Sequence, residues 1–385
     1  MRTVSGLATL VSLALSTPLS AQNESGAFVV RLGKDTIAVE QFTRSGNSLQ
    51  GTFLGRPGQM IQWSYRAELG VDGTVRQFSM TQDKSAVPNA PAQKRSLVFQ
   101  GDSAIVTLTR GDSTRVLRLA APGGAFPFIN HSFALYELVA RRARAAGGDS
   151  LRTAELSLGA NAPWGTTVKR VGADSLALAT DNGLGVRLKT DRSGMILAAN
   201  GFGSTQKVEV ARVQSVDLAR LWDTFAGRPP LGPLSARDTA RVTFGSAVVY
   251  VDYSRPSKRG RVVFGGELVP WNEVWRTGAN AATQLSTPVD LTIGGATVPA
   301  GIYSVWSLPT PTGWKLIINK QHGQWGTEYS ADSDLVRIDV KVEAPLAQPL
   351  ETFTIGFEPQ GDGTAATLKL AWDRTAVTVP VTVKK

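Results

Sequence analysis

RVTFGSAVVYVDYS, residues 241–254, is the stretch that indicates the fold most clearly. β-branched and aromatic residues dominate it, which is typical of strands on a partly buried sheet. Similar runs follow it along the chain, among them VDLTIGG, GIYSVWSLP, GWKLIINK, VRIDVKVE, TFTIGFE and TLKLAWD. Roughly eight or nine short strands with no convincing helix predict an antiparallel β-sandwich, jelly-roll-like, over residues 239–385.

Residues 22–227 are also predicted to be mainly β. Runs such as TIAVEQFT and SAIVTLTR are separated by turn residues, including Gly46 and Gly111, in the pattern of antiparallel hairpins. Two helices interrupt these strands, one near 132–146 and one near 215–226, where good helix formers end at glycines. We expect a curved antiparallel sheet or half-barrel with one or two helices.

The length of 385 residues favours two domains, because single hydrophobic cores usually stop growing at about 250–300 residues. RPPLGPLSARD, residues 228–238, is rich in proline and predicts the linker between them. Residues 1–21 resemble a secretory signal, with one arginine, an apolar run and small residues before a cleavage site near Ala21 and Gln22. We therefore expect an exported protein, periplasmic or extracellular, with no transmembrane helix in its mature form.

Composition narrows the chemistry. The chain has no cysteine, so disulfides, thiolate nucleophiles and thiolate metal sites are excluded. His131 and His322 are the two histidines and form no zinc pattern, so we expect neither metal nor cofactor. Residues 236–385 carry 15 Lys and Arg against 14 Asp and Glu, which leaves most of the net charge of +10 in residues 22–235. No long basic run occurs, and nucleic acid is not an expected partner.

The C-terminal residues carry a recognisable set of motifs, namely YSRPSKRGRVVFG, LVPWNEVWRTGANAAT, GGATVPAGIYSVWSLP, GWKLIINK, QWGTEY and ETFTIGF. In this order they resemble the domain of unknown function 2911 family over residues 236–385. The resemblance implies an exported bacterial protein and names no reaction. Ala281 stands where that family often has an acidic residue. The N-terminal domain is loosely similar to periplasmic lipid-carrier and lipocalin-like half-barrels, an analogy of fold alone.

WNEVWRTGAN, residues 271–280, permits two interpretations. In the structural one, Arg276 pairs with Asp252 or Glu273, Gly278 adopts a positive φ and Asn280 ties down the loop. In the functional one, arginine and asparagine side chains converge on a pocket and bind a carboxylate, a phosphate or sugar hydroxyls. The candidate ligand-binding residues are Tyr253, Arg255, Trp271, Arg276 and Asn280. Lys258 and Arg259, at the tip of an expected turn, are expected to be solvated.

The sequence therefore favours a non-enzymatic binding protein for a small anionic or carbohydrate ligand, or for a partner protein of the cell envelope. The basic N-terminal sheet with its helix is a second expected site, for an apolar or anionic ligand. A carbohydrate-active hydrolase is an alternative, in which Asp252 and Glu273 act as the paired carboxylates, provided that their spacing suits glycoside hydrolysis. A structural or assembly module of the cell envelope is the third interpretation.

Overall fold

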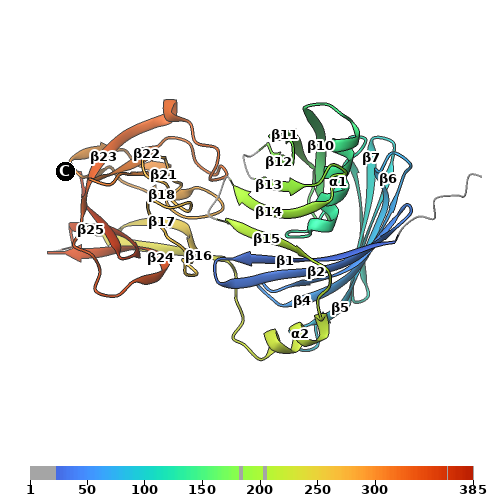
Figure 1. Ribbon diagram of the computed structural model, residues 1–385. Helices are drawn as coiled ribbons and strands as arrows, with labels where there is room; N and C mark the ends of the chain where they lie inside the picture. The colour runs from blue at the N-terminus through green and yellow to red at the C-terminus, as the bar shows by residue number, and fades with distance from the viewer. Residues whose placement is uncertain (1–22, 182–184, 203–205, 362, 385) are drawn as a thin grey trace, which may run out of the picture.

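The computed structural model describes residues 23–181, 185–202, 206–361 and 363–384. The expected signal sequence, residues 1–21, lies outside the described residues. Figure 1 shows two β-rich domains side by side, and the expected fold class is confirmed. Within the described residues, no helix is long and apolar enough to cross a membrane.

The N-terminal domain is one 15-stranded sheet in the order β8-β7-β6-β5-β4-β3-β2-β1-β15-β14-β13-β12-β11-β10-β9. Neighbouring strands are antiparallel except β9 and β10, which are parallel. The strands are β1 Glu24–Leu32, β2 Asp35–Ser45, β3 Ser48–Gly55, β4 Ile61–Leu69, β5 Val75–Ser85, β6 Gln93–Gln100, β7 Ser103–Arg110, β8 Ser113–Ala120, β9 Phe126–Phe128, β10 Ser150–Ser157, β11 Trp164–Arg170, β12 Ser175–Thr180, β13 Gly185–Thr190, β14 Ile196–Phe202 and β15 Val208–Val213.

The hairpin turns follow the sequence. Gly46 and Gly111 have φ angles of 53° and 55°, as tight turns between twisted strands require. The sheet curves around α1 (Phe133–Ala145), which contacts strands as far apart in the strand order as β2, β9, β11 and β14 (Figure 1). Phe133 lies 6.0 Å from the ring of Phe28, so the helix packs into the main apolar core of this domain. Curvature around α1 gives the sheet its half-barrel shape.

The second helix, α2 (Leu218–Ala226), packs on the outer face of β2 and β3, where Phe225 joins a small apolar cluster with Val39 and Leu54. It begins later than the expected 215–226, because the carboxylate of Asp217 accepts a hydrogen bond from the amide of Arg220 and caps the first turn.

The C-terminal domain is an 11-stranded antiparallel sheet that folds back on itself. β24 lies against β16 and β17 without pairing with them, and one apolar cluster fills the space between, as in a sandwich. Its strands are β16 Ser235–Phe244, β17 Ala247–Pro256, β18 Thr283–Thr287, β19 Leu291–Ile293, β20 Ala296–Val298, β21 Gly301–Pro309, β22 Trp314–Asn319, β23 Asp334–Val342, β24 Leu350–Gln360, β25 Ala365–Asp373 and β26 Thr375–Val383, with a short 3-10 helix at Ala331–Ser333. β16 begins inside the segment 228–238 that was expected to be a linker.

The turn after β17 joins the two domains. Arg259 is 7% exposed, and its guanidinium pairs with Asp35 of β2 at 2.6 Å. Its carbonyl also accepts a hydrogen bond from the amide of Lys34. Lys258 pairs with Asp373 at 2.5 Å. The prediction that both side chains are solvated was therefore wrong, because acidic residues from distant strands meet this turn.

Candidate functional site

A cavity of about 440 Å³ lies between α1 and the concave face of the sheet. Aromatic rings form much of its wall, since Phe128, Phe133, Tyr136, Trp164 and Phe202 all line it. The rings contact one another: Phe128 lies 5.8 Å from Trp164 and 6.4 Å from Tyr136, measured between ring centroids. A concave, largely apolar space of this size with a few polar groups is typical of small-molecule sites.

Glu155 of β10 is the acidic residue in this wall. Its side chain is 2% exposed, and Trp164 of β11 stands directly opposite it across the ladder. One carboxylate oxygen accepts a hydrogen bond of 3.2 Å from Thr166. Burial raises the pKa of Glu155 to about 7, and the Thr166 bond opposes this only partly. The charge of Glu155 also adds to burial in raising the pKa of Tyr136.

His131 forms the polar corner of the same cavity. It precedes α1 with a φ of 71°, and it is 8% exposed. Its Nε2 lies 2.5 Å from the side-chain nitrogen of Gln206. Because an amide nitrogen only donates, Nε2 accepts and the proton of the neutral ring sits on Nδ1. Burial lowers the pKa of His131 to about 4, so the ring is uncharged at neutral pH.

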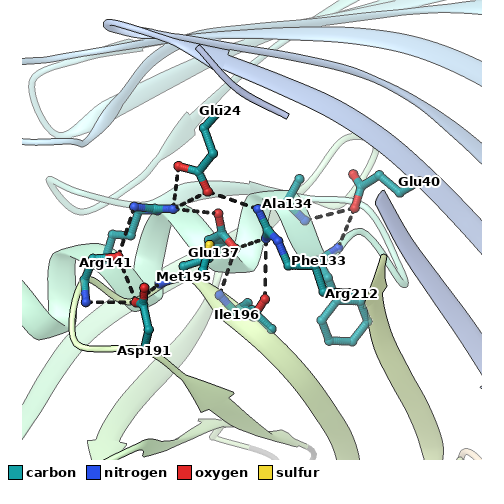
Figure 2. A network of polar contacts seen from close by, with 11 residues as sticks. Glu24, Glu40, Phe133, Ala134, Glu137, Arg141, Asp191, Met195, Ile196 and Arg212 are labelled. Carbon is teal, nitrogen blue, oxygen red and sulfur yellow. Dashed lines mark hydrogen bonds and ion pairs between the residues drawn. The ribbon is translucent and has the colours of Figure 1, made fainter. Parts of the chain in front are cut away.

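A buried polar network fixes the helix that forms one wall of the cavity (Figure 2). Glu40 of β2 is fully buried and accepts hydrogen bonds from the amides of Phe133 and Ala134, at 2.8 and 2.9 Å. The hydroxyls of Ser132 and Tyr65 bind its other oxygen, at 2.5 and 2.7 Å. Glu40 therefore caps the N-terminus of α1 from a distant strand, which is where the helix dipole favours negative charge.

The other half of the network lies further along α1 (Figure 2). Glu137 pairs with Arg212 at 2.6 Å and with Arg141 at 3.0 Å, and it accepts a hydrogen bond from the amide of Ile196. Glu24 of β1 pairs with the same two arginines, at 2.7 Å to Arg141 and 3.0 Å to Arg212. Burial raises the pKa of Glu137, and the two arginines oppose that shift. These contacts tie the helix to β1, β14 and β15.

The C-terminal domain completes the rim of the cavity. Asn280 and Trp325 line it, and the backbone bridge between Ala281 and Trp325 holds the two loops together. Both residues also line a neighbouring hollow of about 290 Å³ at the domain junction, together with Arg276. Among the residues that the structure describes, the buried indole nitrogen of Trp325 has no hydrogen-bond partner. Because Asn280 and Trp325 line both spaces, the cavity and the junction hollow adjoin.

Tyr253 and Arg255, two of the five predicted ligand-binding residues, are held by contacts within the C-terminal domain and line neither the cavity nor the junction hollow. Tyr253 is 1% exposed, and its hydroxyl both accepts from the amide of Ile355 and donates to its carbonyl. Arg255 pairs with Asp238 at 3.0 Å and donates to the carbonyl of Phe353 at 3.1 Å. Arg255 is not among the described residues that line the junction hollow.

The WNEVWRTGAN segment runs along the edge of β21. Trp275 exchanges two backbone hydrogen bonds with Ser307, and Trp271 stacks on Phe264 with 6.3 Å between ring centroids. Arg276 is 7% exposed, donates to the carbonyl of Asn280 at 3.3 Å, and has a pKa lowered to about 10 by burial. Arg276 and Asn280 thus lie together at the junction hollow.

The loop conformation differs from the expected one at a single glycine. Gly278 does not have a positive φ, whereas Thr277 and Asn280 do, at 52° and 61°. Gly278 is needed for close approach instead, because a Cβ there would lie 2.9 Å from the carbonyl oxygen of Ser254 and 3.0 Å from the hydroxyl of Thr283.

Asp252 and Glu273, the weak catalytic candidates, are not brought together by the aromatic cavity, by the junction hollow or by the hollow beside Lys207. Asp252 pairs with Arg237 at 2.5 Å. Glu273 is exposed at the mouth of a hollow of about 210 Å³ that Arg276 and Lys207 also line. Within the described part of the chain, no group of three His, Asp or Glu residues is placed to hold a metal ion.

Sequence reasoning missed Glu155 and Trp164 and treated His131 only as a possible metal ligand. The one signal was Glu155 itself, a glutamate between Ala154 and Leu156 in the strand SLRTAELS. An acidic residue at a position of a strand that faces the core is uncommon unless it has a partner.

Residues 235–381, the C-terminal part of the chain, match the model of a family described as "Protein of unknown function (DUF2911)". No family is assigned to the N-terminal region. A comparison with curated proteins finds no match. Two solved structures are similar to parts of the chain. A DUF1089 family protein from Pseudomonas aeruginosa has 16% identity and a TM-score of 0.32, over 43% of this chain and 90% of that one. A β-barrel-like protein of domain of unknown function DUF1849 from Brucella abortus has 12% identity and a TM-score of 0.34, over 50% and 96%.

Proposed function

We propose that this protein is a non-enzymatic binding protein, and that its ligand is a small molecule with a large apolar part, held between α1 and the curved sheet. The cavity of about 440 Å³ with its aromatic wall is the observation that carries this proposal. Burying apolar surface of a ligand there would contribute roughly 25 cal/mol per Å². The few polar groups, Glu155, His131 and Gln206, would orient the ligand.

The buried network around α1 supports this role. Glu40 and Glu137 hold the helix against several strands, so the wall of the cavity is rigid before a ligand enters. A preformed site binds more tightly than one that must be ordered on binding, because less conformational entropy is lost. The rim residues Asn280 and Trp325 would let the C-terminal domain contact the exposed end of the ligand.

An anionic or sugar-like ligand in the junction hollow is a second candidate. The buried guanidinium of Arg276 at that hollow, next to Asn280, favours it. A carbohydrate-active hydrolase with Asp252 and Glu273 is a weaker alternative, since these residues share no hollow within the described ranges. Two other possibilities, binding of an envelope partner protein and a role in envelope assembly, rest on the sequence alone. The proposed export, directed by residues 1–21, also rests on the sequence alone.

The cavity proposal can be tested with the uncharged fluorescent probe N-phenyl-1-naphthylamine. Val186 lines the cavity, and Val186→Phe would fill part of it. The matched control is Val171→Phe, since Val171 is 52% exposed between β11 and β12. We expect probe fluorescence to rise with the wild-type chain and with the control, and Val186→Phe to weaken binding about tenfold or more. Equal binding by all three proteins would refute the cavity as the site.

A further inference from the structure

Within the described part of the N-terminal domain, Glu40, Glu137 and Glu155 are the buried glutamates, and Glu155 has the fewest polar partners of the three. Glu40 accepts four hydrogen bonds, and Glu137 pairs with two arginines and accepts a hydrogen bond from an amide. Glu155 accepts a single bond, from Thr166 to Oε1. No hydrogen bond joins its Oε2 to another described residue, and Oε2 is not among the fully buried unpaired atoms, so it faces the open space of the cavity that Glu155 lines.

Among the described residues of the cavity wall, no positively charged side chain balances Glu155. The described residues of the cavity wall include no lysine and no arginine. The other ionisable groups facing it are His131, which is uncharged at neutral pH, and Tyr136, whose pKa is raised well above its usual value. A buried carboxylate without a cation is costly, and a position that keeps one is a candidate for binding or chemistry.

The groups around this carboxylate suit one kind of partner. Trp164, which is 43% exposed, stands opposite Glu155 across the ladder, and Tyr136 lies close enough for the charge of Glu155 to add to burial in raising its pKa. Phe128 contacts both rings. The electron-rich faces of aromatic rings attract ammonium groups, most strongly where water is excluded. A carboxylate set among such rings is the arrangement that recognises amines.

We propose that the cavity selects an organic cation, a primary or quaternary ammonium group on an apolar body, with Glu155 as its counter-ion and the rings of Trp164 and Tyr136 around the charge. This inference rests on the cavity being the binding site. The inference specifies the charge of the ligand, which the volume and the apolar lining of the cavity do not determine.

The pKa of about 7 at Glu155 gives the proposal a pH signature. Below that value the carboxyl is protonated and neutral, so an ammonium group gains little from it. Above that pH the carboxylate is ionised, and a bound cation offsets the free-energy cost of burying its negative charge. His131 and Tyr136 stay uncharged across the same interval, so Glu155 is the group of the cavity wall that changes. Preference for a cation therefore increases from about pH 5.5 to about pH 8.

The experiment uses three probes with one body, 4-phenylbutylamine, 4-phenylbutanol and 4-phenylbutanoate, titrated calorimetrically into the full chain at about pH 5.5 and pH 8. We expect the amine to bind about tenfold more tightly than the alcohol at the higher pH, and the acid most weakly. Glu155→Gln should abolish the preference for the amine and keep the affinity for the alcohol. Glu155→Asp, which retains the charge, should keep part of the preference. Glu209→Gln, on the exposed side of β15, is the matched control.

The outcomes separate the two proposals. If the alcohol binds and the amine has no advantage, or if Glu155→Gln keeps that advantage, the cation inference is overturned and the cavity proposal stands. If the acid binds best, an anion site is favoured and the inference again fails. If none of the three probes binds and N-phenyl-1-naphthylamine binds equally to wild type and Val186→Phe, the proposed function itself fails.

Discussion

Replacing Glu155 by Gln should stabilise the ligand-free protein, and the gain should depend on pH. Gln keeps the size of the side chain and an oxygen that can accept from Thr166, while it removes the ionisable group. Burial raises the pKa of Glu155 from 4.5 to about 7, so the folded state disfavours the ionised form. Stability from the protonated carboxyl is thus fully present below pH 4.5 and is lost as pH rises through about 7.

The size of the effect follows from that shift. Each pKa unit corresponds to about 1.4 kcal/mol, and between about pH 5 and about pH 8 the wild type should lose roughly 2–3 kcal/mol relative to Glu155→Gln. Because the side chain is 2% exposed, solvent screening should reduce this only modestly. Glu209→Gln, on the exposed side of the same sheet, should show no such trend.

Urea unfolding of the full chain at the two pH values, followed by tryptophan fluorescence, measures the difference. The two domains are expected to unfold in separable transitions, and the comparison concerns the transition that the substitution shifts. A stability difference between wild type and Glu155→Gln that stays constant from pH 5 to pH 8 would refute the reasoning, because it would mean that Glu155 keeps an ordinary pKa in the folded protein.

Three further substitutions test how the structure is held together. Glu40→Ala leaves two helix amides and two hydroxyls without their acceptor, and urea unfolding should show a loss of about 3–5 kcal/mol. Arg212→Ala leaves a buried carboxylate with one arginine fewer and should cost about 3 kcal/mol, whereas exposed Arg187→Ala should cost under about 0.5. Gly278→Ala places a Cβ 2.9 Å from a carbonyl oxygen and should lower the melting temperature by several degrees, whereas Gly356→Ala, with open space around its Cβ, should not.

Local features of the chain made much of the fold predictable. The hairpin β16–β17 turns at Gly245, whose φ is 60°, and its strands alternate between core and surface, as their composition favours. The two helices were expected within a few residues of their observed ends, because good helix formers and terminal glycines act over short distances. Composition and turn signals therefore predicted the mainly β class.

Contacts between residues distant in the sequence were not predictable. Glu40 caps α1 across 93 and 94 positions, where local rules would consider only Ser132 beside the helix. Arg259 reaches Asp35 across 224 positions, so its local appearance as a turn residue suggested solvent. Neither contact changes the pattern of apolar residues, which is the signal that sequence reasoning uses.

The candidate site shows the same limit. WNEVWRTGAN was predicted to contain binding residues because arginine, asparagine and tryptophan are concentrated there. Two of its side chains, Arg276 and Asn280, lie at the junction hollow. The larger cavity is lined by Glu155 of β10, Trp164 of β11 and His131 in the turn before α1, with ordinary residues around them. Pairing of β10 with β11 places Glu155 opposite Trp164, and packing of α1 against the curved sheet brings His131 to the same cavity.

Photolabelling with benzophenone, an uncharged aromatic probe, tests the central claim most directly. Irradiation of the full chain with this probe, followed by peptide mass spectrometry, locates the covalent adducts. We expect adducts on peptides that carry the lining residues of the N-terminal domain, which lie within 128–136, 155–164, 178–186 and 201–208, and their loss when N-phenyl-1-naphthylamine is present in excess. Adducts spread over the surface, or confined to the C-terminal domain, or unaffected by the competitor, would contradict the account.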